Sequence, residues 1–441
     1  MPSPAAPGAP PRGRLSSLAG LGPGYWKLWS ASVVSNLGDG TSFVAYPWLA
    51  STLTRDPILI AGLGVATRLP WLLFSLPAGA IVDRADRRRL MMWMNAARAA
   101  LSGAVALSVL TGTMTIPLLY AAALVIGCAE VLYDNAAQTI MPRLVPPDRL
   151  ERANGNLWGA ETVMNQFVGP PLGGVLVAVG LSVPFFVDAG SFALAGGLIL
   201  LIGGLHRAAP AADSGSPATR RSLVSEMREG FAWLWRHRLL RLLAIMLGAI
   251  NAAGAMSFAI FVLFVQEILD LGSAGFGLVM TAGAVGAVVG SVIAPSITRR
   301  IGAGPSLWAT LGLGVLTQAA TGSTSAALVA GVMSAGFSFG AVLWNIVTVS
   351  LRQQIIPDHL LGRVNSVYRF FGWGMMPIGA LAGGAIVAIV EPLAGRDLAL
   401  RAPFFASSAI SLVCLGIALP TLTTARVEAA RSASAAAPAS R

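Results

Sequence analysis

The sequence predicts an all-α membrane protein with twelve transmembrane helices arranged as two halves of six. Composition is the first reason: 55% of the 441 residues are hydrophobic and only 11% are charged, whereas soluble domains carry about 25% charged residues. The mean hydropathy of +0.72 is the second. The third is a series of twelve apolar segments, each near the roughly 20 residues that a membrane span requires. These features exclude a soluble enzyme and a disordered chain.

The segments divide the chain into five parts. Residues 1–24 and 426–441 are rich in small residues and predict disordered cytoplasmic tails. Residues 25–205 form the first six-helix half, 206–238 a cytoplasmic linker, and 239–425 the second half. The expected spans are 27–50, 58–82, 90–112, 116–141, 156–180, 183–205, 239–265, 274–298, 305–321, 326–350, 366–390 and 402–424.

The linker contains an amphipathic stretch from Leu223 to Arg238. Phe231, Leu234 and Trp235 recur there at helical spacing. The pattern predicts a basic helix that lies on the inner membrane surface between the two halves.

The charge balance sets the topology and excludes several activities. Lys and Arg total 30 against 19 Asp and Glu, for a net charge of +11. Because cytoplasmic loops collect positive residues, this excess predicts a multi-pass protein of the cytoplasmic (inner) membrane with both termini cytoplasmic, and it requires no nucleic acid partner. The single lysine, Lys27, excludes a phosphate-binding loop for ATP. The positions of cysteine and histidine predict no metal site, and no cofactor is expected.

The two halves repeat each other weakly. Asn36 and Ser42-Phe43 of the first half match Asn251 and Ser257-Phe258 of the second half, and Asn135 matches Asn345. The matches occur in the same order and at nearly constant spacing. Duplicated halves related by an axis along the membrane normal place a substrate path between them. We therefore expect polar side chains on that path, and the candidates for the cavity are Asn36, Glu161, Asn165, Asn251 and Asn345.

The loop after the second span reads Gly79-Ala-Ile-Val-Asp83-Arg84-Ala-Asp86-Arg87-Arg88-Arg89. It resembles the G-x-x-x-D-R-x-x-R-[RK] signature of the major facilitator superfamily. The resemblance implies that Gly79, Asp83, Arg84 and Arg87 latch an inner gate, with Asp134 as the acidic partner.

The fifth span contains Gly169-Pro170-Pro171-Leu172-Gly173-Gly174. It resembles the core of that superfamily's antiporter signature, although Asn165 replaces an earlier glycine. The alternative interpretation is an ordinary interface of small residues between helices.

Further motifs narrow the resemblance to one branch: Asn36-Leu-Gly-Asp39, Arg68-Leu-Pro70, Pro142-Arg143-Leu-Val-Pro-Pro-Asp148-Arg-Leu and Arg152-Ala-Asn154. Over about residues 25–425 the chain resembles macrolide-efflux and enterobactin-exporter-like transporters. The resemblance implies the major facilitator fold and proton-driven export of small amphipathic molecules.

Charged residues inside spans are costly and usually functional. Asp39 in the first span and Arg68 in the second lie at similar depth, which predicts an ion pair, and Glu130 in the fourth span lies near the same plane. Because burial favours the neutral form of a carboxyl group, Glu130 is also a candidate proton carrier. In the alternative, the pair braces two helices and Glu130 makes a structural hydrogen bond. Asp188 is expected only to start a helix.

These observations predict a monomeric exporter, set in the lipid bilayer, that exchanges a lipophilic or amphipathic small molecule, drug-like or siderophore-like, for protons by alternating access. One alternative is a proton-independent or uptake carrier of the same fold. The other is a non-transporting membrane receptor or assembly factor, which would need a soluble domain that the sequence lacks.

Overall fold

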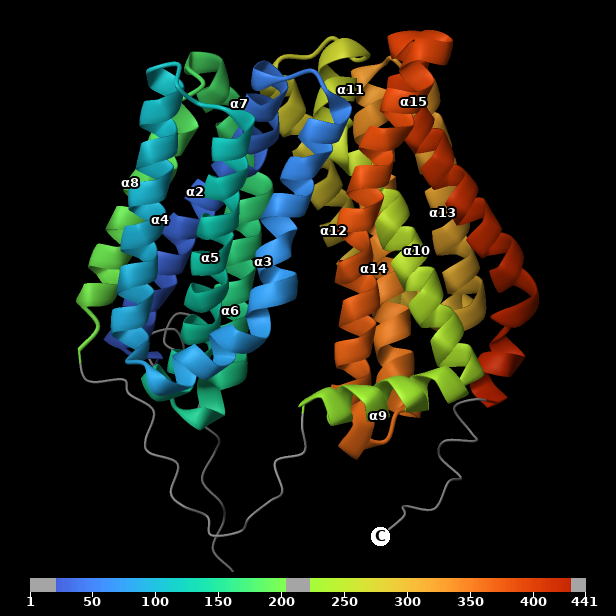
Figure 1. Ribbon diagram of the computed structural model, residues 1–441. Helices are drawn as coiled ribbons and strands as arrows, with labels where there is room; N and C mark the ends of the chain where they lie inside the picture. The colour runs from blue at the N-terminus through green and yellow to red at the C-terminus, as the bar shows by residue number, and fades with distance from the viewer. Residues whose placement is uncertain (1–20, 204–222, 430–441) are drawn as a thin grey trace, which may run out of the picture.

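The computed structural model describes residues 21–203 and 223–429, and this part of the chain is almost entirely helical. Two groups of helices stand side by side: α2 to α8 form the N-terminal half, and α10 to α15 form the C-terminal half (Figure 1). The helices of the N-terminal half are α2 (Pro23–Leu53), α3 (Pro57–Arg84), α4 (Arg87–Leu110), α5 (Ile116–Leu144), α6 (Leu150–Thr162), α7 (Gly169–Val179) and α8 (Val183–Leu200). Those that follow are α9 (Leu223–Arg236), α10 (Arg238–Ala259), α11 (Phe261–Glu267), α12 (Ser273–Ile301), α13 (Ala303–Ser323), α14 (Ala327–Ile355) and α15 (Asp358–Thr421).

Nine helices in the described ranges are long and apolar enough to cross a membrane. One of them, α15, consists of two helical stretches that meet at Gly395, where φ is 82°. That left-handed conformation suits a residue without a Cβ. The arrangement is consistent with twelve crossings, and the elements begin and end within a few residues of most predicted spans. The fifth predicted span is longer than expected and begins at Pro147.

This fifth span changes its helical winding at its centre. A short 3₁₀ turn (Pro147–Arg149) leads into α6, and a π-helical turn (Val163–Val168) joins α6 to α7. Pro170 and Pro171 follow directly, and neither can donate a backbone hydrogen bond to the preceding turn. The wider π turn accommodates this loss, and such turns are frequent at functional sites.

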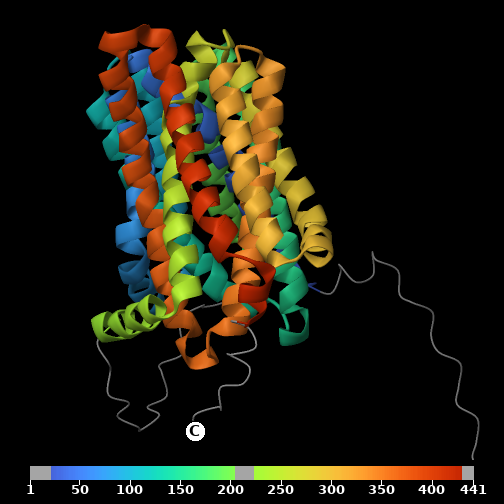
Figure 2. The same ribbon diagram turned by 90° about the vertical axis from the view of Figure 1, so that its right-hand side faces the viewer.

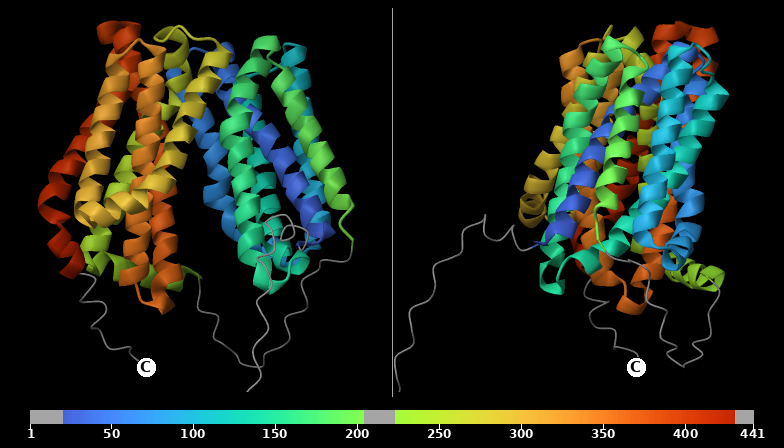
Figure 3. Two further views of the ribbon diagram at one scale, coloured as in Figure 1. Left: turned by 180° about the vertical axis from the view of Figure 1, so that it is seen from behind. Right: turned by 90° about the vertical axis from the view of Figure 1, so that its left-hand side faces the viewer.

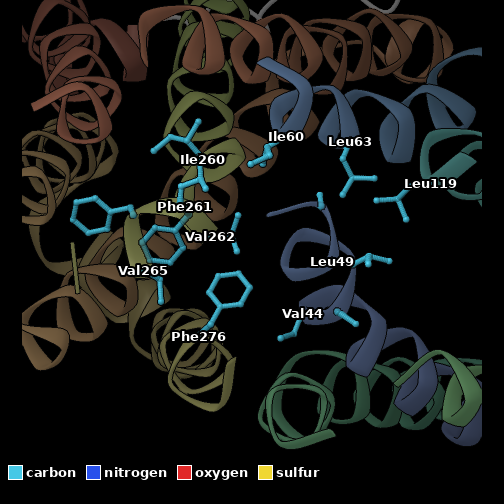
Figure 4. Packing of buried hydrophobic residues seen from close by; sticks show 14 of the residues in the cluster. Val44, Leu49, Ile60, Leu63, Leu119, Ile260, Phe261, Val262, Val265 and Phe276 are labelled. Atoms are coloured by element: carbon cyan, nitrogen blue, oxygen red, sulfur yellow. The ribbon is translucent and has the colours of Figure 1, made fainter. Parts of the chain in front are cut away.

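One apolar cluster joins the two halves at one end of the bundle. It unites Val44 and Leu49 of α2 and Ile60 of α3 with the segment Ile260–Val265 and with Phe276 of α12. Figure 4 shows side chains from both halves in this cluster. We call this end of the bundle the closed end.

Ion pairs reinforce the closed end. Glu267, at the end of α11, lies 2.9 Å from Arg396 of α15 and 3.4 Å from Arg55, which follows α2. Arg396 also lies 2.9 Å from Glu391, and it donates a hydrogen bond to the carbonyl oxygen of Arg55. Arg55 in turn donates to the side chain of Gln266 over 2.6 Å. The network therefore ties the loop between α2 and α3 to the C-terminal half.

At the opposite end the two halves have separate cores. One cluster contains only residues of the N-terminal half, among them Tyr25, Met91 and Ile199, and another contains only residues from Leu234 onward. Front and back views show the two groups of helices diverging toward this end (Figures 1 and 3). We call it the open end.

Helix α9 lies at the open end, across the direction of the bundle (Figures 1 and 2). Glu229 pairs with Arg363 of α15 at 2.9 Å. Leu234 is fully buried against the C-terminal half, whereas Phe231 and Trp235 stack on each other and remain exposed. Leu234 thus anchors α9 to the bundle, whereas Phe231 and Trp235 remain on its exposed side.

Close packing of α12 on α14 generates a stability prediction. A Cβ on Gly286 would lie 2.5 Å from the carbonyl carbon of Ala335, whereas a Cβ on Gly190 of α8 would meet nothing within 4 Å. We expect Gly286→Ala to destabilise the protein by about 1–3 kcal/mol through overpacking. Gly190→Ala should have no destabilising effect, because alanine favours a helix over glycine by about 1 kcal/mol. Thermal unfolding in detergent compares the two, and equal midpoints would contradict the packing.

Candidate functional site

An ion pair between α2 and α4 lies in the interior of the N-terminal half. Arg98 Nη2 of α4 lies 2.5 Å from Asp39 Oδ1 of α2, and only 2% of the Arg98 side chain is exposed. A buried guanidinium costs several kcal/mol unless a carboxylate compensates it. The predicted pairing of Asp39 with Arg68 is therefore wrong: the partner of Asp39 is Arg98, which comes from the third span.

Aromatic rings complete the surroundings of Arg98. Its guanidinium carbon lies 3.9 Å from the centroid of the Phe192 ring of α8 and 6.0 Å from that of Tyr133 of α5. Cations are attracted to the faces of such rings. Arg98 Nε is buried and has no hydrogen-bond partner among the described residues, so Asp39 carries the polar contact of this guanidinium.

Asp188 of α8 belongs to the same region. It is 2% exposed, and its Oδ2 accepts a hydrogen bond of 2.9 Å from Ser102 of α4. Its Oδ1 is buried as well, and Ser42 of α2 is a second hydroxyl neighbour of this carboxyl group. Asp188 also interacts electrostatically with Asp39 and Arg98. The expectation that it merely starts a helix is wrong, because α8 begins at Val183 and Asp188 points into the bundle.

Two further carboxyl groups lie on α5, one helical turn apart. Glu130 interacts electrostatically with Asp39, Arg98 and Arg68, and Asp134 interacts with Glu130 and Arg98. We use the name charge centre for the group Asp39, Arg98, Glu130, Asp134 and Asp188. Its members come from α2, α4, α5 and α8, and it sets four carboxyl groups against one guanidinium.

Arg68 of α3 lies at the edge of the charge centre and faces the other half. Its guanidinium carbon is 5.6 Å from the centroid of the Trp373 ring of α15. Among the described residues it forms no salt bridge, and its electrostatic partner is Glu130. Arg68 thus connects the acidic N-terminal half with the cavity described next.

A cavity of about 390 Å³ lies between Arg68 and the C-terminal half. Asn251 of α10 and Asn345 of α14, both expected on the substrate path, line it. Asn251 donates a hydrogen bond of 2.9 Å to the carbonyl oxygen of Gly372 in α15. The remaining lining includes Trp344, Trp373, Phe337, Tyr368, Arg352 and Arg369.

The other three polar candidates form a separate cluster between α2 and the fifth span. Ser32 donates a hydrogen bond of 2.6 Å to Glu161, and Asn36 donates one of 3.0 Å to the carbonyl oxygen of Ser32. Asn165 of the π turn lies 3.5 Å from Asn36. These residues therefore lie together in the N-terminal half and do not line the cavity of the C-terminal half.

The glycines of the antiporter segment lie at helix contacts. Gly169 packs against Gly40 of α2, and a Cβ on Gly173 would lie 2.5 Å from the carbonyl oxygen of Thr41 in α2. Gly174 faces Ser273 of α12 in the other half, and Ser273 Oγ donates a hydrogen bond of 2.7 Å to the Gly174 carbonyl oxygen.

Pro170 extends the contact of the antiporter segment with α12, because its carbonyl oxygen faces Gly277. The segment therefore packs on α2 and on the C-terminal half at once.

The loop between α3 and α4 lies at the open end. Asp86 caps α4 by accepting a hydrogen bond of 2.9 Å from the Arg89 backbone. Arg87 is 9% exposed and its Nε has no partner among the described residues, while Arg84 is exposed. The Asp83 side chain lies outside the part of the chain whose side chains are described. A Cβ on Gly79 would meet nothing within 4 Å, so no helix approaches closely there in this structure, whereas the sequence had suggested that this glycine allows a close approach of helices.

Asp134 was expected as the acidic partner of this loop. Its electrostatic neighbours are Glu130, Arg98, Asp39 and Glu161, and no salt bridge joins it to Arg84 or Arg87 within the described ranges. In this structure Asp134 therefore groups with the charge centre.

Depth along each span identified the charged residues but not their partners. Arg98, Asp39, Arg68 and Glu130 all lie deep in apolar segments, so depth alone permits several pairings. The pairing depends on which helices touch, and α4 packs against α8 and α5 while α3 packs against α5 and α15. The sequence could have indicated the role of Asp188, because a carboxylate inside an apolar segment needs a hydrogen-bond donor or a cation.

Comparisons with known proteins cover nearly the whole chain. A model of the transmembrane secretion effector family matches residues 16–437. The multidrug efflux pump Tap of Mycobacterium tuberculosis is 28% identical over an alignment of 422 residues that covers 91% of this chain and 94% of that protein. Tap of Mycolicibacterium fortuitum is 27% identical over 389 residues, 85% of this chain and 91% of that protein.

Solved structures share the fold. A bacterial homologue of the iron transporter ferroportin in an inward-facing state gives a TM-score of 0.68 at 17% identity, covering 90% of this chain and 98% of that chain. A bacterial homologue of the human lysosomal transporter Spinster, inward-facing and unoccupied, gives 0.66 at 13% identity, covering 93% and 97%. At these identities the likeness establishes the fold alone. The chain belongs to the transmembrane secretion effector family of major facilitator transporters.

Proposed function

We propose that this transporter exports lipophilic or amphipathic small molecules in exchange for protons. The observation that carries the proposal is the composition of the charge centre, in which four buried or half-buried carboxyl groups share one guanidinium. Charged carboxylates away from water are stable only with partners. Arg98 forms an ion pair with one of the four, Asp39, and Glu130 also interacts with Arg68. The centre therefore holds more carboxyl groups than guanidinium groups, and the excess carboxyl groups are the sites at which we propose that protons bind.

Proton exchange at the charge centre would act on the ion pair. When Asp39 takes up a proton, its attraction for Arg98 falls, and Arg98 turns toward Asp188, Glu130 or Asp134. The helices α2, α4, α5 and α8 all contribute to the charge centre. A change of ion pairing there therefore alters the relative free energies of two packing arrangements of the N-terminal half. Coupling requires only that protons bind one of these arrangements more tightly.

The shape of the bundle supports alternating access. The closed end is sealed by a shared apolar cluster and by the ion pairs of Glu267, and the open end has two separate cores. Arginines of the loop between α3 and α4 and of the end of α12 gather at the open end. Because positive residues remain on the cytoplasmic side, we assign the open end to the cytoplasm, with both termini there and the protein in the inner membrane.

The inner gate is part of the same proposal. On rocking of the halves, the loop carrying Asp83, Arg84 and Arg87 would approach the C-terminal half, and Gly79 would then allow close contact. The unpartnered Nε of Arg87 supports this assignment, because a buried donor without an acceptor favours an arrangement that supplies one.

The multidrug efflux pumps named Tap are similar along nearly the whole chain, which supports export of drug-like molecules. A facilitated carrier with structural carboxyl groups is the competing function. It differs in one measurable respect, since its flux does not depend on a proton gradient.

Removal of one carboxyl group tests the proton coupling. In proteoliposomes with an imposed pH gradient, Asp39→Asn and Glu130→Gln should each lower gradient-driven export at least about tenfold, which equals about 1.4 kcal/mol of barrier. Flux without a gradient should persist. Glu428→Gln, an exposed position in the C-terminal segment, is the matched control. Wild-type gradient dependence in both variants would contradict the role of these carboxyl groups in coupling, whereas export by the parent protein that does not respond to the gradient would establish the facilitated carrier.

The buried ion pair generates a folding prediction. Arg98→Ala leaves Asp39 without its cation and should cost about 3–5 kcal/mol of stability. Adding Asp39→Asn to Arg98→Ala should restore part of that loss, because no unpaired charge remains. Arg300→Ala, an exposed arginine at the end of α12, should have little effect. Thermal unfolding of the purified variants in detergent measures the differences, and a fully stable Arg98→Ala protein would refute the pairing.

The antiporter segment generates the next prediction. Gly173→Leu places a side chain where Thr41 of α2 lies, so α7 and α2 must separate. Export should fall at least about tenfold, or a proton leak should appear in vesicles loaded with a pH-sensitive dye. Gly416→Leu is the control, since a Cβ there meets nothing within 4 Å. Normal export without a leak in Gly173→Leu would show that this contact plays no part in transport.

A further inference from the structure

The charges that line the cavity are all positive. Arg68 of α3, Arg352 of α14 and Arg369 of α15 reach it from three helices and from both halves, and no aspartate or glutamate is among its lining residues. We propose that the transported molecule is an anionic amphipath, a carboxylate, sulfonate or phosphate attached to an aromatic or apolar body. This inference rests on the proposed export function and specifies its substrate class.

Internal contacts account for only one of the three guanidinium groups. Arg352 donates a hydrogen bond of 3.2 Å to Asn365, and its guanidinium carbon lies 4.5 Å from the centroid of the Tyr368 ring. Arg68 touches the ring of Trp373 but forms no hydrogen bond within the described ranges. Arg369 is exposed to the cavity and likewise forms no ion pair there. Two guanidinium groups thus retain donors for an anion, which Arg binds well because its donors are planar and paired.

A buried donor points in the same direction. Trp344 is 3% exposed, lines the cavity, and its Nε1 has no hydrogen-bond partner among the described residues. An indole nitrogen can only donate, so an acceptor on the substrate would satisfy it. Asn345 lies beside Trp344 in the lining and adds an amide.

The walls suit an aromatic or apolar body. Phe337, Tyr368 and Trp373 line the cavity together with leucine and isoleucine side chains. Its volume of about 390 Å³ falls within the range of small-molecule sites. A cationic molecule of the same shape would meet three like charges, and like-charge contact in a site of low dielectric opposes binding.

The test compares three probes that share one ring system: 1-naphthalenesulfonate, neutral 1-naphthol and 1-naphthyltrimethylammonium. Calorimetric titration of the purified full-length protein in nonionic detergent, without added lipid, keeps anionic headgroups out of the cavity. We expect the sulfonate to bind at least about tenfold more tightly than the ammonium compound.

Substitutions locate the binding site. Arg369→Gln and Arg68→Gln should each weaken sulfonate binding about tenfold and leave naphthol binding unchanged. Arg300→Gln, which removes an equal charge outside the cavity, should alter neither. The proposal is overturned if the ammonium compound binds as tightly as the sulfonate, or if both cavity variants bind the sulfonate like the parent protein.

The measurement also separates this inference from proton coupling, because no gradient is present. A protein that prefers the sulfonate but transports independently of protons contradicts only the coupling. Suppose instead that an imposed pH gradient drives export of a cationic drug and that the protein shows no preference for the sulfonate. That result contradicts only the substrate class.

Discussion

The burial of Arg98 is the constraint on which the N-terminal half depends. A guanidinium that is 2% exposed inside a membrane protein requires a carboxylate, and Asp39 supplies it at 2.5 Å. To bring the two together, α2 must pack closely on the helices that surround α4. Gly38 makes this possible, since a side chain there would collide with Asp188 and Ser191 of α8. Electrostatics and close packing therefore impose the same geometry on α2, α4 and α8.

The two halves divide the chemistry between them. The N-terminal half holds the charge centre, and the C-terminal half supplies most of a cavity whose charges are arginines. Arg68 belongs to both, because it interacts with Glu130 on one side and contacts Trp373 on the other. A movement of α3 relative to α15 changes the contact with Trp373, and a change in the charge of Glu130 changes the attraction on the same guanidinium. Under the proposed function, Arg68 is the residue through which a change of protonation at Glu130 would reach the substrate cavity.

Periodicity and composition predicted the helices because a membrane leaves few alternatives: every backbone polar group must be paired within its own segment. They could not predict which faces meet. Asp39 was assigned to Arg68 because both lie at one depth, yet the orientation of α4 brings Arg98 to it instead. Asn251 and Asn345 line a cavity, whereas Asn36, Glu161 and Asn165 were chosen on the same grounds but lie at a different helix contact. The depth of a residue in the membrane follows from the local sequence of its span. The rotation of a helix about its own axis depends on how it packs against neighbouring helices.

The fifth span shows how local sequence determines a movable contact. Two prolines remove hydrogen bonds, and the π turn absorbs the loss. Gly173 and Gly174 then contact α2 and α12 from adjacent positions of one helix. Small residues at a helix contact provide little interlocking of side chains, so such a contact can shift without repacking a core. Gly174 contacts Ser273 of the other half. A shift of α7 at this point therefore changes contacts in both halves. Under the proposed alternating access, this segment is where we expect the halves to turn on each other.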